Sequence, residues 1–288
     1  MLLALLVTLL WSTSFIIIKL GLTELPPLTF AGLRYFLAFL CLLPVTLRRK
    51  DTRAEFRYLS RRQWLRLVAL GLVFYTFTQG AQFLGLALLP AVTVSLMLNF
   101  TPLVVAVAGI RLLQELPTPR QWLGVFLFIA GILVYFYPAD FGASRWTGLV
   151  VMGFGVLANS GAALLGRDIN RRGDLSPLLV TTVSMGIGAV ILLVAGIIIQ
   201  GLPPLGWRMI AALVWLAAVN TALAFTLWNI TLRTLSAMES SIINGTMLIQ
   251  IAVLAWIFLG EAITSQEIAG ILLAALGVVL VQLKNIHR

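Results

Sequence analysis

The chain has 288 residues, of which 60% are hydrophobic and 10% are charged, whereas about a quarter of the residues in a soluble domain are charged. Its 20 Lys and Arg against 10 Asp and Glu give a net charge of +10. Cys41 is the only cysteine, which excludes an internal disulfide. His287 is the only histidine, which disfavours a histidine-based metal site or catalytic triad. The composition predicts an all-α integral membrane protein without cofactor or metal.

Ten apolar stretches have about the length that crosses a bilayer, and turn residues such as Pro26 and Pro27 separate them. We therefore expect ten transmembrane helices, joined by loops too short for a soluble domain. The expected spans are Leu2–Leu20, Leu28–Leu47, Trp64–Leu86, Ala91–Leu113, Gln121–Pro138, Trp146–Gly166, Pro177–Gln200, Trp207–Leu232, Ala237–Leu259 and Gln266–Leu283.

The basic residues predict the orientation of these helices. A cytoplasmic N-terminus puts every Lys and Arg on the cytoplasmic side except Lys19, Arg34, Arg145 and Arg208. Both termini are then cytoplasmic, and residues 284–288 form a short cytoplasmic tail. The charge is thus distributed as in a plasma (inner) membrane protein, which argues against a nucleic-acid partner.

Two stretches repeat each other at an offset of 146 residues, because Ala91–Val134 aligns without a gap on Ala237–Leu280. The offset is near half the chain length and predicts two copies of one unit, residues 1–138 and 146–283. Each copy holds five spans, an odd number, so the second enters the membrane from the opposite side. Such an inverted repeat places a substrate site near the membrane centre and allows alternating access.

Polar side chains at mid-membrane depth are the candidates for substrate binding, because they are costly there unless they face other helices or a wet cavity. Asn99 is the strongest candidate, since Pro102 removes the backbone hydrogen bond to the carbonyl of Leu98. Two tryptophans inside apolar spans could stack on a ring or a cation. The candidates are Gln79, Ser95, Asn99, Asn159, Asn229, Asn244, Trp11 and Trp228; for each, helix packing is the alternative.

Charged residues near the helix ends are the candidates for gating. Lys19 and Arg34 would by default extend to the lipid headgroups. The sharper hypothesis is an outer gate in which Lys19 pairs with Glu261, with Arg167 and Glu115 as the inner counterpart. Glu239, at the cytoplasmic start of the ninth span, suits a helix N-terminus and is also the candidate for coupling to H⁺.

Glycines spaced by seven residues predict helix-packing seams, because each pair lies on one helix face and lets two backbones approach closely. The pairs are Gly124 with Gly131 in the fifth span and Gly270 with Gly277 in the tenth.

Several motifs, in their order and doubling, resemble the drug/metabolite transporter superfamily, in its ten-helix EamA-type branch. They are Trp11–Lys19, Pro27–Phe36, Asn99–Pro102 and Leu259–Thr264, with Gly270 and Gly277. The resemblance covers the whole chain and implies transport of small metabolites such as amino acids, drugs, nucleosides or sugar phosphates. It departs at Leu248, where the family usually has a proline that mirrors Pro102, so perfect symmetry of the helix kinks is not implied.

We therefore predict a secondary transporter that exports small polar metabolites, with amino acids or related compounds favoured. The expected partners are the substrate and the bilayer, with H⁺ as a candidate coupling ion, and the protein is expected to be a monomer. A drug, nucleoside or sugar-phosphate transporter of the same fold remains an alternative. A channel is the alternative of another class, while an intramembrane enzyme lacks the necessary Asp, Glu or His within the spans.

Overall fold

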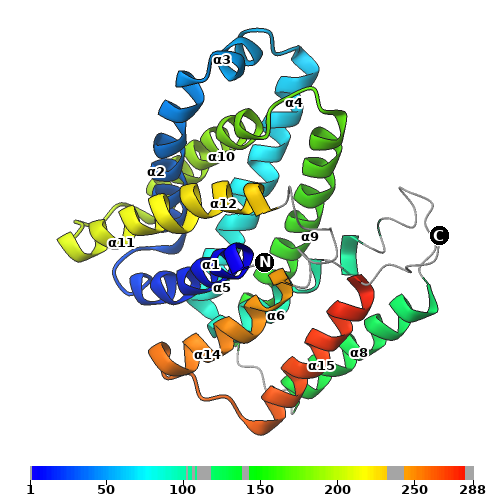
Figure 1. Ribbon diagram of the computed structural model, residues 1–288. Helices are drawn as coiled ribbons and strands as arrows, with labels where there is room; N and C mark the ends of the chain where they lie inside the picture. The colour runs from blue at the N-terminus through cyan, green and yellow to red at the C-terminus, as the bar shows by residue number, and fades with distance from the viewer. Residues whose placement is uncertain are drawn as a thin grey trace. The chain divides into compact units, whose positions relative to one another are not determined.

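The computed structural model describes residues 2–101, 103–105, 108, 118–137, 143–231 and 243–282, and its regular structure there is helical (Figure 1). The elements are α1 (Leu2–Gly21), α2 (Pro27–Arg48), α3 (Lys50–Arg57), α4 (Arg61–Leu70), η1 (Gly71–Thr78), α5 (Gln79–Leu88), α6 (Ala91–Leu98), α8 (Pro119–Phe136), α9 (Ala143–Arg172), α10 (Pro177–Gln200), α11 (Trp207–Ala217), η2 (Ala218–Leu223), α12 (Ala224–Thr231), α14 (Met247–Leu259) and α15 (Ser265–Gln282). The segments η1 and η2 are π-helical.

Within these ranges, six helical stretches are long and apolar enough to cross a membrane: 2–21, 27–48, 61–88, 145–170, 177–200 and 207–228. Four shorter apolar helices cover 91–105, 122–136, 243–259 and 265–280. Each of the ten expected spans overlaps one of these stretches. The protein is thus an all-helical, multi-pass membrane protein, while the count of ten crossings and the orientation of the termini stay predictions.

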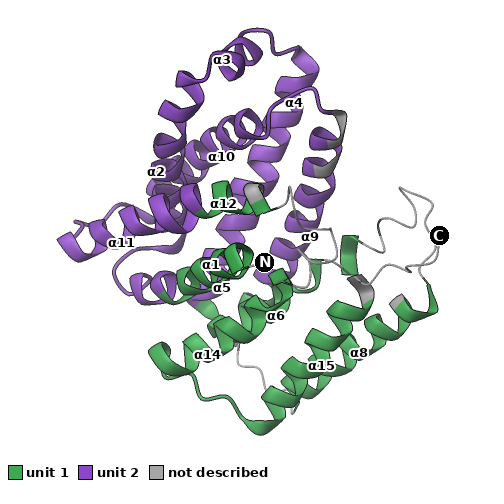
Figure 2. Ribbon diagram, in the orientation of Figure 1, with its two compact units in different colours: residues 1–16, 88–150, 224–288 green, residues 17–87, 151–223 purple. Residues whose placement is uncertain are grey.

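The helices group into two compact units (Figure 2). Unit 1 comprises residues 1–16, 88–150 and 224–288, and unit 2 comprises residues 17–87 and 151–223. Each unit draws on both copies of the sequence repeat, so a unit is defined by packing and is not the same as a repeat.

In unit 1, α8 and α15 lie side by side and form the seam that the glycine spacing predicts (Figure 1). A Cβ atom on Gly131 would lie 2.5 Å from the backbone nitrogen of Ala274 and 2.6 Å from the carbonyl oxygen of Gly270. A Cβ atom on Gly277 would lie 2.6 Å from the carbonyl oxygen of Gly124. The two backbones therefore touch without intervening side chains, and the predicted role of these glycines is confirmed.

Unit 2 contains a corresponding seam between α2 and α10. A side chain on Gly32 would collide with the backbone of Leu193, and one on Gly196 would lie 2.6 Å from the backbone nitrogen of Thr29. A hydrogen bond of 2.8 Å between the hydroxyls of Thr46 and Thr182 ties the same pair of helices further along. Close backbone packing thus joins α2 to α10 over several turns.

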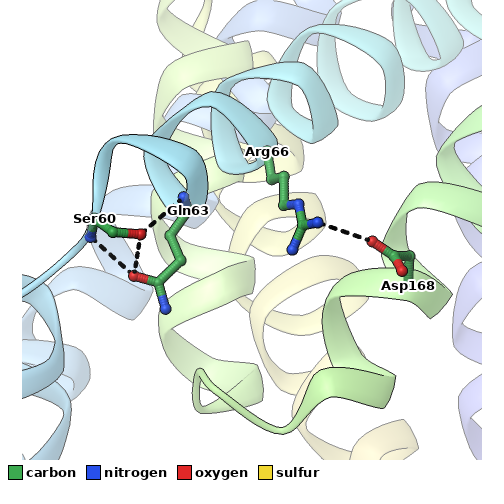
Figure 3. Close-up of polar contacts among 4 residues, drawn as sticks. All are labelled: Ser60, Gln63, Arg66 and Asp168. Carbon is green, nitrogen blue, oxygen red and sulfur yellow. Dashed lines mark hydrogen bonds and ion pairs between the residues drawn. The ribbon is translucent and has the colours of Figure 1, made fainter.

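The basic loop after α2 contains an additional helix, α3, which the hydropathy pattern does not predict because it is short and highly charged. The next helix, α4, begins with a capping box: the backbone N–H of Gln63 donates to Oγ of Ser60, and the N–H of Ser60 donates to Oε1 of Gln63 (Figure 3). One turn later Arg66 pairs with Asp168 of α9 at 3.7 Å (Figure 3).

The π-helical segments occupy repeat-related positions, since shifting residues 71–78 by 146 gives 217–224. Widening of the turn frees backbone carbonyls. Threonine hydroxyls take up two of them, each five residues back: Thr78 donates to Val73 at 2.9 Å, and Thr221 donates to Leu216 at 2.8 Å. Both copies thus carry an irregular turn at the same place, within unit 2.

Candidate functional site

Two helices of unit 1 are interrupted at matching positions. Helix α6 ends before a turn at Asn99 and Phe100, while α14 begins after a turn at Thr246. At the first turn the backbone N–H of Phe100 donates to the carbonyl of Met97 at 3.0 Å, and at the second the N–H of Thr246 donates to the carbonyl of Ile243 at 3.1 Å. The two donors, Phe100 and Thr246, are 146 residues apart in the chain, and so are the two acceptors, Met97 and Ile243. Breaks of this kind supply backbone groups for substrates in transporters.

Local side-chain bonds accompany both breaks. The Nδ2 of Asn99 donates to the carbonyl of Ser95 at 2.8 Å, and the hydroxyl of Thr246 donates to the carbonyl of Ile243 at 2.6 Å. Such side chains compete with the helix for its own carbonyls and bend it. The second copy is therefore interrupted although it has Leu248 in place of the proline, so the missing proline does not abolish the symmetry. Pro102 itself lies outside the described residues.

A polar network crosses from α1 to α14 through the side chain of Gln250. Its Oε1 accepts from the hydroxyl of Ser12 at 2.9 Å, and its Nε2 donates to the hydroxyls of Thr246 at 3.0 Å and Thr8 at 3.2 Å. The sequence prediction left out Thr8 and Ser12. Their spacing of four residues, which puts both hydroxyls on one face of an apolar helix, was the signal that could have identified them.

The two tryptophans selected from the sequence lie against each other. The ring centroids of Trp11 and Trp228 are 5.2 Å apart, and those of Trp11 and Phe225 are 5.4 Å apart. The Nε1 of Trp11 is buried and has no hydrogen-bond partner among the residues that the structure describes. A buried donor without an acceptor is costly, about 1–3 kcal/mol, so this N–H is suited to receive an acceptor from a ligand.

The π-helical segment η2 of unit 2 contacts a buried cation. Arg34 is only 4% exposed, and its Nε donates to the hydroxyl of Thr221 at 3.1 Å. Next to it, the hydroxyl of Tyr35 donates to Oε1 of Gln79 at 2.6 Å. The expectation that Arg34 extends to the headgroups is therefore wrong. Its side chain lies inward, because Thr221 in the widened turn of η2 offers it an acceptor.

The two expected gate residues both hold helix termini. The Nζ of Lys19 donates to the carbonyl of Leu86 at 2.6 Å, near the C-terminus of α5. Glu261 accepts from the backbone N–H groups of Ala91 at 2.8 Å and Val92 at 3.4 Å, at the N-terminus of α6. Each charge has the sign that favours the helix end beside it. The proposed pair between Lys19 and Glu261 stays a prediction.

The remaining candidates belong to both units: Ser95 and Asn244 to unit 1, and Asn159 to unit 2. Ser95 is buried, Asn159 is half-buried in α9 and Asn244 is exposed. The side chains of Asn229 and Arg167 lie outside what the structure describes, as do Glu115 and Glu239 altogether.

A cavity of about 560 Å³ lies in unit 1 around the N-terminus of α6. Tyr135, Arg145, Glu261 and Glu267 line it, together with Thr93, whose hydroxyl is 3.0 Å from that of Tyr135. The volume falls in the range of small-molecule sites. Since Glu261 lines this space, the cap of α6 is accessible to whatever fills it.

These features define a membrane protein with interrupted helices and polar groups held among apolar spans, as in proteins that carry small molecules. The model of the EamA-like transporter family matches residues 1–137 and 146–283. The chain belongs to the EamA-like transporter family, which confirms the resemblance seen in its motifs.

Named relatives agree with this assignment. The uncharacterized transporters YvbV and YoaV of Bacillus subtilis are 27% and 25% identical over 282 and 280 residues, which cover 96% and 94% of this chain and 88% and 92% of theirs. An uncharacterized transporter of Archaeoglobus fulgidus is 34% identical over 126 residues, 44% of this chain and 42% of its own. A solved crystal structure matches with a TM-score of 0.70 over 97% of this chain and 95% of its own; at 18% identity it shows the fold alone.

Proposed function

We propose that the protein is a secondary transporter that exports amino acids or related small polar metabolites across the plasma membrane by alternating access. The observation that carries this proposal is the pair of helix interruptions 146 residues apart. With ten spans in two inverted repeats, residues 1–138 and 146–283, and both termini cytoplasmic, the two breaks would be related by a two-fold axis in the membrane plane. Exchange of their conformations would open the site to each side in turn.

The buried polar groups fit a zwitterion. The guanidinium of Arg34 has five N–H donors, and Thr221 is the only hydrogen-bond acceptor that the described part of the chain gives it. A carboxylate would take the remaining donors in the bidentate geometry that Arg favours. Within unit 2, the amide of Gln79 also suits a neutral polar atom of the substrate. Within unit 1, taken by itself, the hydroxyl of Ser12 suits a neutral polar atom, and the ring of Trp11 suits an apolar or cationic part.

Energy for transport would come from a gradient, because the sequence contains no ATP-binding motif. Glu239 is the proposed site of H⁺ coupling. If it carries protons, replacement by Gln removes the dependence of transport on a pH gradient; dependence that survives in Glu239→Gln assigns the carboxylate to the helix terminus alone. The fused inverted repeats would remove the need for a second copy, so we propose a monomer.

The test is counterflow of radiolabelled compounds in proteoliposomes that contain the whole protein. The panel comprises neutral and aromatic amino acids, nucleosides, organic cations and sugar phosphates, each with and without a pH gradient. We expect counterflow of amino acids. Counterflow of cations or sugar phosphates alone would overturn the substrate class but retain the carrier, whereas flux without stimulation by substrate on the far side would indicate a channel.

A further inference from the structure

A groove of about 500 Å³ lies within unit 2, where α2, α3, α4 and α10 meet. Its lining is largely aliphatic and aromatic, with Phe39 and Leu43 from α2, Phe56 from α3 and Val190 from α10. Leu47, Phe56 and Val190 are 54%, 46% and 43% exposed, so the groove opens on the surface of the protein.

Polar contacts on two sides hold the groove open. The hydroxyls of Thr46 and Thr182, 2.8 Å apart, tie α2 to α10 along the groove. The backbone N–H of Ser176, the N-cap residue of α10, donates to Oε2 of Glu55 at 2.9 Å and holds α3 in place. The rings of Phe56 and Trp64 meet edge to face at 5.7 Å. The groove is therefore built into the fold and needs no rearrangement to accept a ligand.

One end of the groove is strongly basic. Arg53 lines it, and other exposed basic residues surround it in the chain: Arg48, Arg49, Lys50, Arg57, Arg61 and Arg62. They outnumber the two acidic residues of this stretch, Asp51 and Glu55, and Glu55 is engaged by Ser176. The ion pair of the described residues, Arg66 with Asp168, involves none of these basic side chains. The cluster thus keeps its positive charge beside the mouth of the groove.

We propose that this groove binds an anionic phospholipid, with an acyl chain along α2 and α10 and the phosphate at Arg53. From Phe39 to Leu47 the helix rises about 12 Å, which matches roughly ten methylene groups of an extended chain. The basic loop would meet the headgroups of the cytoplasmic leaflet, where basic pockets select anionic lipids. Apolar packing supplies affinity for any lipid, and Arg53 with its neighbours supplies preference for negative charge.

The inference concerns a lipid site on the outside of unit 2 and holds whether or not amino acids are the substrate. Native mass spectrometry of the detergent-purified full chain is the test, with phosphatidylglycerol and phosphatidylcholine of the same acyl chains. We expect phosphatidylglycerol to bind more tightly. Arg53→Gln should weaken its binding about fivefold, the value of one basic residue at an anionic surface, and leave phosphatidylcholine unchanged. The matched control is Arg208→Gln, which removes one charge far from this loop in the sequence.

A second variant tests the groove itself. Val190→Trp places a large ring in its opening and should displace both lipids, whereas Val194→Trp, one turn further along α10 and outside the lining, should not. Both valines are exposed, so the fold tolerates the substitutions. Equal binding of the two lipids, or full binding in Arg53→Gln and Val190→Trp, would overturn the proposal. So would equal binding of glycerol phosphate, since that would require no acyl groove.

Discussion

Arg34 and Thr221 form a hydrogen bond of 3.1 Å in which both side chains are almost completely buried. The threonine belongs to the π-helical segment η2 and donates its own hydrogen to the carbonyl of Leu216. The widened turn thus lets a hydroxyl serve as donor to the backbone and acceptor for a cation at once. An anion is the natural further partner of this guanidinium, because burying a charge is expensive unless it is paired.

Arg34→Gln should reduce transport of a carboxylate-bearing substrate about 10- to 100-fold in kcat/KM. The reason is the loss of a charge-assisted hydrogen bond, about 1.5–3 kcal/mol. Initial counterflow rates measure it, with the corresponding amine that lacks the carboxylate as the matched substrate. Its transport should change little. An equal loss for both substrates would assign Arg34 to the architecture of unit 2 rather than to recognition.

Trp11→Phe should weaken substrate binding about five- to tenfold, the value of a neutral hydrogen bond of ~1 kcal/mol, without lowering Tm. The variant keeps an aromatic ring against Trp228 and Phe225, and it removes a buried N–H that has no partner in the described part of the chain. Equilibrium binding and thermal unfolding in detergent give the two readouts. Trp215→Phe, at an exposed position, is the control. A drop in Tm with unchanged affinity would show that Trp11 only packs.

Gly131→Ala should destabilise the protein by about 1–3 kcal/mol, the range for overpacking a close contact. The added methyl would lie 2.5 Å from the backbone nitrogen of Ala274, which cannot yield as a flexible side chain could. Gly153→Ala in α9 is the matched control, since nothing lies within 4 Å of its added carbon. Thermal unfolding in detergent compares them. Equal Tm values in the two variants would refute the tight seam between α8 and α15.

Glu261→Gln should shift the balance between outward-open and inward-open states about two- to fivefold, because a carboxylate at a helix N-terminus contributes roughly 0.3–1 kcal/mol. The readout is thiol labelling of Ser265→Cys, which lines the same cavity, in a Cys41→Ser background. Substrate affinity should change less than labelling. Unaltered labelling would remove Glu261 from the gate and leave it as a cap of α6.

Apolar length predicted the positions of the long helices, and glycine spacing predicted that α8 and α15 each carry a packing seam, but not that these two helices pack against each other. The seam at Gly131 and Gly277 follows from sequence because only a residue without a side chain allows two backbones to touch. The pairing of Trp11 with Trp228 was not predictable, since these residues are far apart in the chain and each alone is compatible with packing anywhere.

Irregular backbone was the main feature that sequence reasoning missed. The π-helical turns at η1 and η2 arise where threonines bond five residues back, and hydropathy is insensitive to such a change. The inward course of Arg34 depends on that geometry, because Thr221 meets it only where the turn is widened. Helix α3 was not predicted for a different reason. Its charged residues are typical of a loop, although the bond from Ser176 to Glu55 holds the helix beside α10.

The break before α14 has a consequence for how the two copies have diverged. In the first copy the side-chain amide of Asn99 donates to the carbonyl of Ser95. In the second copy the hydroxyl of Thr246 donates to the carbonyl of Ile243. Different residues thus produce the same backbone interruption in the two copies. The relationship between the copies is therefore clearer in their hydrogen bonds at this position than in their amino-acid identities. Leu248 lies in the first turn of α14, where a proline is tolerated, so a proline at this position would leave the backbone shape intact.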